Sequence, residues 1–253
     1  MSVVNIAAVR AIASMIRPIE DRAVSLFDEL LSARSYVVSF VNAHAVNLAC
    51  KNVEFFTALT HADLLLRDGI GAKILMRALG RNPGFNMNGT DFIPRMLLAS
   101  KSKAIALYGS SAKVAALAAA CLQRDGVATV THCDGYQPIA HYVERVKVEQ
   151  PRVVILGMGM PKQEFLAQVI MKECSNPVLI INGGAILDFM AGRFKRAPLP
   201  LRRFGMEWLF RLWLEPARLW RRYMLGNLAF LIRASLAGLC YRFGDRQIND
   251  KRL

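Results

Sequence analysis

A regular alternation of apolar runs and helix-length segments occupies residues 103–183. The runs KAIALYG, VATVTH, RVVILG and PVLIING are rich in strand-forming residues, and a segment of helical character separates each run from the next. Strands spaced in this way pair in parallel, because each connecting helix returns the chain to the same edge of the sheet. The alternation therefore predicts an α/β fold with a Rossmann-like, mostly parallel sheet flanked by helices.

The first hundred residues extend this pattern less regularly. Met1–Asp21 is a mildly amphipathic lead that we expect to be peripheral to the core. Further along, apolar spacing predicts a strand at Tyr36–Val41 and an apolar run that ends at Asp68-Gly69. The helices expected around them are Glu20–Ala33, Ala45–Leu59, Ala72–Leu79 and Phe92–Ser100, the last capped by Thr90-Asp91.

Polar residues and glycines gather where the predicted strands end. Ligands bind outside the carboxyl ends of strands in open parallel sheets, so these positions form a candidate site. They are Asn42, Asp68, Gly109, Gly135, Gly157, Gly159, Lys162, Gln163, Gly183 and Gly184.

The stretch Val153–Glu164 (VVILGMGMPKQE) is the most suggestive of these strand ends. A strand that opens through glycines into a helix start offers free N–H groups and the positive end of a helix dipole to a phosphate. An ordinary strand-to-helix turn is the alternative. A dinucleotide is disfavoured because Lys162 stands where G-x-G-x-x-G requires its third glycine. The chain also contains no Walker loop and no D-x-D sequence.

Asp68 is the best acid/base candidate, because it follows an apolar run and Gly69 leaves room for a substrate. The alternative is a turn-forming Asp-Gly pair. Five cysteines without a C-x-x-C pair imply neither a disulfide framework nor a zinc site, and they suit a reducing cytoplasm. We expect no metal ion and no cofactor.

The positive charge is concentrated in the C-terminal part of the chain. Residues 193–253 carry +10 of the net charge of +14, which indicates an anionic partner. Met206–Tyr223 is dense in aromatic residues and arginine, and Leu225–Tyr241 is almost entirely apolar. As a membrane span Leu225–Tyr241 is short and contains Arg233. An interfacial helix pair on an anionic membrane fits better; a helix that covers the core and a nucleic-acid surface are the alternatives.

Taken together, these segments resemble the WecG/TagA/CpsF glycosyltransferases of bacterial cell-surface polysaccharide synthesis. The resemblance runs from about Tyr36 to Tyr223. The matching stretches are ADLLLRDGIG, NGTDF, LYGSS, CDGY, GMGMPKQE, INGGAILDFMAGRFKRAP and EWLFRLWLEPARLWRRY.

The resemblance implies an inverting transfer of a sugar from a UDP-sugar to a polyprenyl-diphosphate-linked glycan, at the cytoplasmic face of the membrane. It assigns Asp68 as the catalytic base, Asn42 and Gln163 as substrate contacts, and the tail as a membrane-docking segment. Thr90 and Asp91 of NGTDF join the substrate-binding candidates. Positive charge for the departing diphosphate would come from Lys162, Arg196, Arg211, Arg218 and Arg222.

One departure concerns the donor sugar. Members that use N-acetylmannosamine donors typically read Thr-x-Asn where this chain reads Phe40-Val41-Asn42. The missing hydroxyl makes a plain hexose such as glucose as suitable a donor as an N-acetylmannosamine-type sugar.

We expect two domains, a catalytic α/β domain over residues 1–192 and a basic, membrane-associating helical appendage over residues 193–253. The expected partners are the UDP-sugar, the lipid-linked acceptor and an anionic membrane, without nucleic acid; the oligomeric state, including a homo-oligomer, stays open. Two rival functions are a non-catalytic scaffold recruited to the membrane on the same fold and a basic nucleic-acid-binding module.

Overall fold

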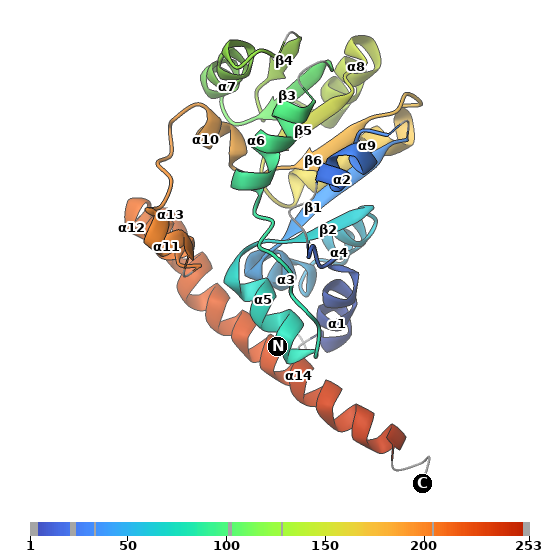
Figure 1. The fold of residues 1–253 in the computed structure, drawn as a ribbon, viewed down its shortest axis with the longest axis vertical. Helices are drawn as coiled ribbons and strands as arrows, with labels where there is room; N and C mark the ends of the chain where they lie inside the picture. Colours follow the sequence, from blue (N-terminus) through green and yellow to red (C-terminus); the bar gives the residue numbers. More distant parts are fainter. Residues whose placement is uncertain are drawn as a thin grey trace.

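A six-stranded sheet forms the centre of the protein in the computed structural model, which describes residues 5–20, 24–32, 34–100, 103–127, 129–203 and 205–249. All five pairs of neighbouring strands are parallel, in the order β2-β1-β6-β5-β3-β4 (Figure 1). The predicted parallel α/β fold is confirmed. The strands are β1 (Tyr36–Val41), β2 (Leu64–Arg67), β3 (Ile105–Gly109), β4 (Val130–Cys133), β5 (Val153–Gly157) and β6 (Leu179–Asn182).

Helices cover both faces of this sheet, so alternate residues of each inner strand enter two separate apolar clusters. One face is covered by α1 (Ile6–Met15), α3 (Ala43–Ala49), α4 (Val53–Thr60), α5 (Gly69–Ala78), α8 (Ile139–Glu149), α9 (Lys162–Glu173) and α14 (Gly226–Asn249). The other face is covered by α2 (Val24–Leu30), α6 (Gly89–Ala99), α7 (Ala112–Arg124) and α10 (Ile186–Met190).

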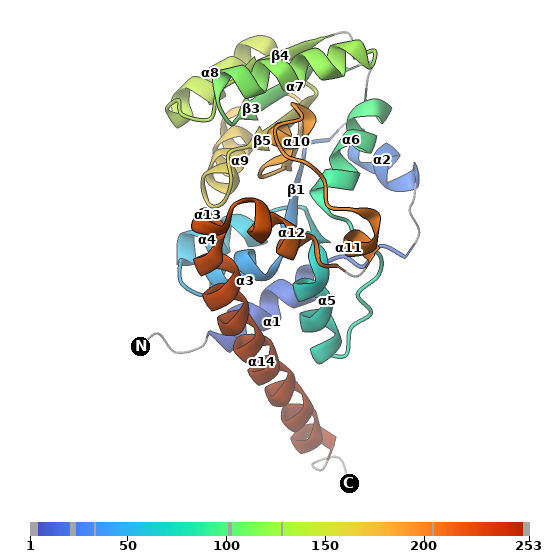
Figure 2. The ribbon, with the colours of Figure 1, turned by 90° about the vertical axis from the view of Figure 1, so that its left-hand side faces the viewer.

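The C-terminal segment is helical, as predicted, and ends in one long helix (Figures 1 and 2). Two short helices, α11 (Leu199–Arg203) and α12 (Glu207–Leu214), precede a continuous run of α13 (Pro216–Trp220), the π-helical turn η1 (Arg221–Leu225) and α14. By length and composition alone, Pro216–Phe243 could cross a membrane. The predicted 17-residue apolar segment was therefore too short, because the helix extends beyond it at both ends.

One face of α14 packs against α3, α5 and α1. Phe230, Ala234 and Ala237 on this face are at most 2% exposed and belong to the core. Arg233, which interrupts the apolar sequence, is also turned inward and is buried. The helix thus covers the core, which the sequence argument had treated as an alternative to membrane contact, while its opposite face stays exposed.

Two predictions for the N-terminal half were wrong. The lead is not peripheral, because Val9 and Ile12 of α1 are fully buried and α1 lies against α14. The expected single helix over Ala45–Leu59 is two helices, α3 and α4, since Asn52 ends the first run and caps the second by accepting the N–H of Phe55 (2.7 Å).

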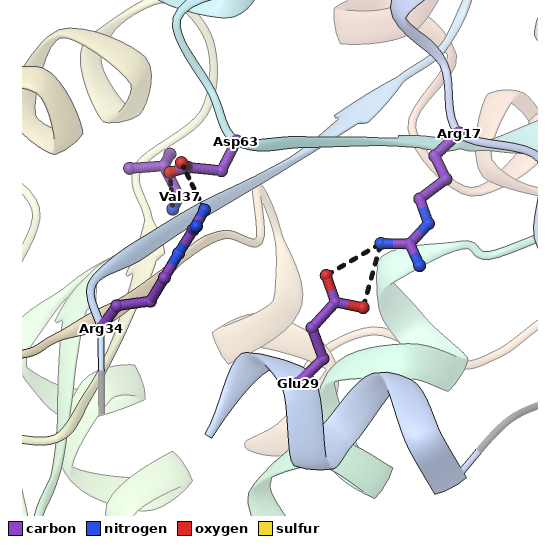
Figure 3. A network of polar contacts seen from close by, with 5 residues as sticks. All are labelled: Arg17, Glu29, Arg34, Val37 and Asp63. Atoms are coloured by element: carbon purple, nitrogen blue, oxygen red, sulfur yellow. Dashed lines mark hydrogen bonds and ion pairs between the residues drawn. The ribbon is translucent and has the colours of Figure 1, made fainter. Parts of the chain in front are cut away.

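Polar contacts at the amino ends of β1 and β2 hold the edge of the sheet (Figure 3). The Oδ2 atom of Asp63 accepts the backbone N–H of Val37 (2.9 Å), and Oδ1 lies 3.5 Å from the Arg34 guanidinium. Nearby, Arg17 donates to both carboxylate oxygens of Glu29 (3.0 and 3.1 Å). The Asp63 contacts tie the start of β2 to β1, and the Arg17–Glu29 pair ties α2 to the segment that follows α1.

The carboxyl ends of β3, β4 and β5 approach one another without side chains between them. A Cβ atom added to Gly109 would lie 2.3 Å from the carbonyl oxygen of Gly157, and one added to Gly135 would lie 3.1 Å from Gly109 Cα. The N–H of Ser110 donates to Gly157 (3.2 Å), and that of Gly135 donates to the carbonyl of Ser110 (2.9 Å). Glycine is therefore required here for close backbone packing.

We predict that Gly109→Ala lowers the free energy of unfolding far more than Gly126→Ala. Both glycines have positive φ (+148° and +94°), so each substitution carries a backbone cost on the order of 1 kcal/mol. Only Gly109 adds a clash with backbone, of about 1–3 kcal/mol, because nothing lies within 4 Å of the Cβ position of Gly126. Denaturant unfolding measures both; equal losses would contradict this packing.

Candidate active site

A carboxylate and an amide from neighbouring strands meet at the carboxyl edge of the sheet. Asn42 follows β1 and Asp68 follows β2, and the Nδ2 of Asn42 donates to Asp68 Oδ2 (3.1 Å). The Oδ1 of Asn42 is occupied, since it caps α3 by accepting the N–H groups of His44 and Ala45 (both 3.1 Å). Asp68 itself makes no capping bond to α5. The half-buried carboxylate is thus fixed by one oxygen, and no described residue is bonded to the other.

A buried arginine that sequence reasoning missed, Arg67, directly precedes Asp68 in the chain. Arg67 is 5% exposed and donates to the carbonyls of Gly69 (3.1 Å), Pro83 (2.9 Å) and Gly84 (3.0 Å). Burial lowers the pKa of the guanidinium below its usual value, although the negative charge of Asp68 acts in the opposite direction. Arg67 therefore holds the loop before α6 against the turn that carries Asp68. The sequence signal that could have identified Arg67 is its position at the end of an otherwise apolar strand, where a charged side chain needs buried partners.

The start of α6 contributes Thr90 and Asp91. Asn88, rather than Thr90-Asp91, caps this helix: its Oδ1 accepts the N–H of Asp91, and its Nδ2 donates to Asp91 Oδ2 (both 2.9 Å). Asp91 also forms an ion pair with Arg196 (2.9 Å). Burial opposes ionisation of Asp91, but the hydrogen bonds from Asn88 and Arg196 leave its pKa below the ordinary value.

The GMGMPKQE stretch is tied to its neighbours by its own side chains. Gln163 is buried, and its Oε1 accepts the N–H groups of Gly159 (3.2 Å) and Gly184 (3.0 Å). Lys162 Nζ donates to the carbonyls of Gly135 (2.9 Å) and Gln137 (3.1 Å). Gln163 and Lys162 therefore join the loops after β4, β5 and β6, and two of the expected phosphate-binding N–H groups already have partners.

Glu164, in the first turn of α9, is buried, and sequence reasoning did not select it as a functional residue. It accepts from Gln163 Nε2 (2.8 Å), and its Oε2 is buried with no partner among the described residues. Burial raises the pKa of this carboxyl to about 7. On the adjoining loop, Gly183 sits against Ile93 and Ile186, where a Cβ atom would clash.

The C-terminal helices α11, α12 and α13 lie near α5, which begins directly after Asp68 (Figure 2). Their arginines bring positive charge to this side of the edge. The guanidinium of Arg211 in α12 lies 4.8 Å from the ring centre of Phe189 in α10. Arg211 also lines a small pocket with Thr90, Phe189, Lys195, Arg196, Ala197, Glu207 and Phe210. Burial, reinforced by the charge of Asp68, raises the pKa of Glu207, a residue that sequence reasoning did not select.

Arg222, in the π-helical turn, faces the same region. Burial lowers its pKa and that of His44, and the charge of Arg222 contributes to bringing the His44 pKa to about 4. The Nε of Arg222 is buried without a hydrogen-bond partner among the described residues. Arg218 is different, because it is exposed and forms an ion pair with Glu215. The charges of Asp68, Arg211 and Arg218 all act on Arg222, and those of Asp68, Arg211 and Arg196 act on Glu207. The four arginines therefore lie on the Asp68 side of the edge.

The described residues contain no group of three or more His, Cys, Asp or Glu side chains that could hold a metal ion. A larger hollow lies at the opposite edge of the sheet, before β5 and β6, away from Asp68. Its lining residues are Val146, Lys147, Gln150, Pro151, Glu173, Cys174, Ser175, Asn176 and Val178. The polar groups that sequence reasoning selected lie at the carboxyl edge instead.

Comparison with known proteins identifies the family. Residues 11–243 match the family described as Glycosyl transferase WecG/TagA/CpsF. Among curated proteins, the chain is 30% identical over 181 residues to an N-acetylglucosaminyldiphosphoundecaprenol N-acetyl-beta-D-mannosaminyltransferase of Bacillus spizizenii, covering 70% of each chain. It is 28% identical to the protein of that name from Bacillus subtilis, over 74% of this chain and 75% of the relative. The chain is therefore a glycosyltransferase and belongs to the WecG/TagA/CpsF family.

Proposed function

We propose that this glycosyltransferase moves a sugar from a UDP-sugar to a polyprenyl-diphosphate-linked glycan, with inversion at the anomeric carbon. The observation that carries the proposal is the half-buried Asp68 carboxylate, held by Asn42 and faced by arginines of the C-terminal segment. The names of the relatives describe transfer of N-acetylmannosamine to a diphosphoundecaprenol-linked N-acetylglucosamine, which is the same class of acceptor.

In this reaction the oxygen of an acceptor hydroxyl attacks the anomeric carbon of the donor. Asp68 takes the proton of that hydroxyl as the new glycosidic bond forms. The bond from the anomeric carbon to the diphosphate breaks on the opposite side, and UDP leaves with the bonding electrons. Arg222 and Arg211 would stabilise the negative charge that develops on the diphosphate, because charge-assisted hydrogen bonds are strong where water is scarce. Arg196, paired with Asp91, lines the same small pocket as Arg211 and would add to this positive charge.

The donor sugar is proposed as a hexose such as glucose or an N-acetylmannosamine-type sugar. Phe40 is 5% exposed and packs edge-to-face on Phe92 (ring centres 5.9 Å apart), close to Gly89 at the start of α6. An apolar ring therefore stands where relatives with a hydroxyl would offer a hydrogen bond. A panel of UDP-sugars, assayed for UDP release with a synthetic polyprenyl-diphosphate sugar, separates the two donor classes.

We also propose that the protein works on the cytoplasmic face of the membrane, with α14 lying on its surface. The outward face of α14, with the last residue of the turn before it, is a stripe of exposed apolar side chains: Leu225, Leu228, Leu231, Ile232, Leu239 and Phe243. Trp213 and Trp220 are exposed just before it, and the segment is rich in arginine. Such a surface suits the interface of an anionic bilayer. Because the inward face is occupied by the core, the proposal places α14 along the membrane.

We predict that Asp68→Asn lowers kcat by about 100-fold or more, because the amide cannot accept the proton. Binding of the UDP-sugar, measured by calorimetry, should change little. Asp63→Asn is the matched control: it alters a carboxylate at the opposite end of β2, whose contacts are with Val37 and Arg34, and should keep near-normal turnover. Turnover of the Asp68 variant close to that of the wild type would refute the base assignment.

A second prediction concerns the membrane. The double variant Leu228→Glu/Ile232→Glu should bind vesicles that contain anionic lipid much more weakly in a sedimentation assay, with little change in Tm, since both side chains are about half exposed. Leu117→Glu, at a similarly exposed leucine on α7, should bind as the wild type does. If the double variant sediments fully with vesicles, α14 is not the membrane-binding element.

A further inference from the structure

A small set of buried polar contacts joins α3 to α14. The Nδ2 of Asn47 donates to the carbonyl of Gly226 (2.6 Å), and the Nη1 of Arg233 donates to the Oδ1 of Asn47 (2.6 Å). Asn47 and Arg233 are each 8% exposed, although they lie 186 residues apart in the sequence. The Asn47 amide on α3 is therefore hydrogen-bonded to Gly226 and to Arg233, which are about two turns of α14 apart.

These contacts require the burial of an amide and of a guanidinium charge, which costs free energy of desolvation. The described residues provide no acidic partner for Arg233, and its Nε is buried without a hydrogen bond. Phe230, Ala234 and Ala237 already supply an apolar docking face. Apolar contacts tolerate small slides and rotations of a helix, whereas two short hydrogen bonds fix its position along and around its axis. The polar set therefore specifies where α14 sits.

The anchored residue adjoins the segment that carries Arg222. Gly226 directly follows the π-helical turn Arg221–Leu225, and its N–H donates to the carbonyl of Arg221. A single π-helical turn inside a long helix is often found at functional sites. Fixing the carbonyl of Gly226 consequently fixes the direction in which Arg222 leaves the helix.

The other end of the same short helix holds the carboxylate. Asn42 caps α3 and donates to Asp68, while Asn47 lies five residues further along. A helix of this length is about 10 Å long and moves as a rigid unit. Because α3 contacts Asp68 at one end and α14 at the other, it fixes the position of Arg222 relative to that of Asp68.

We propose that Asn47 and Arg233 are positioning residues, which set the register of α14 so that Arg222 reaches the diphosphate of the substrate. This inference rests on the proposed function, in which Arg222 contacts the diphosphate. Asn47 and Arg233 themselves touch no reacting atom; they act through Arg222.

The test is a double-mutant cycle between the anchor and Arg222. The anchor variant is Asn47→Leu/Arg233→Met, because replacing both buried partners with apolar groups avoids leaving one unpaired and should keep α14 docked. We expect a Tm within a few degrees of the wild type by circular dichroism. Pyrophosphate affinity, measured by calorimetry, should fall about 10-fold, as it should for Arg222→Ala.

The combined variant decides the outcome. If the anchor acts through Arg222, adding Arg222→Ala to the anchor variant weakens pyrophosphate binding by less than about twofold, and kcat follows the same pattern. Phe230→Leu is the control: it loosens the same helix interface without touching the polar set, so its effect should multiply with that of Arg222→Ala.

Three results would overturn the inference. These are full pyrophosphate affinity in the anchor variant, full affinity in Arg222→Ala, and effects that multiply in the combined variant. The pyrophosphate measurement does not depend on sugar transfer. A wild-type protein that binds pyrophosphate but turns over no UDP-sugar would count against the proposed function alone.

Discussion

Burial of the sheet on both faces is the constraint from which the rest of the structure follows. Five of the six strands are buried along their whole length, so polar side chains that could reach a substrate stand in the segments that leave the strands. Because every strand runs in the same direction, all of these departures lie at one edge. Asp68 and Asn42 meet there only because β2 pairs with β1, although they lie 26 positions apart in sequence, with α3 and α4 between them.

The two halves of the carboxyl edge of the sheet differ in the chemical groups that line them. Around β3, β4 and β5 it is made of backbone, with Gly109, Gly135 and Gly157 packed in near contact. Around β1 and β2 it is made of charged and amide side chains, joined by arginines from the tail. In the proposed function this division is useful: a flat nucleotide suits the backbone half, and proton transfer and departure of the diphosphate suit the charged half.

Local patterns predicted the strands and most of the candidate positions, because alternation and strand ends are properties of short segments. They did not predict how those side chains are used. Gln163 was expected to contact substrate but bonds to Gly159 and Gly184, which depends on loops from three strands coming together. Likewise Arg233 argued against a membrane span in the sequence, yet it turns inward to Asn47, a contact across most of the chain. Long-range packing of this kind leaves no local signal.

The packing of the first helix against the last also has a consequence for how the protein is made. The face that α14 covers is formed by α1, α3 and α5, all of which belong to the first third of the chain. These helices leave the ribosome long before their cover is synthesised. Their apolar surface therefore stays open during translation, and this part of the core can close only after α14 has been synthesised. The π-helical turn that carries Arg222 is assembled in that same final step, so an unfinished chain lacks an arginine on which the proposed function depends.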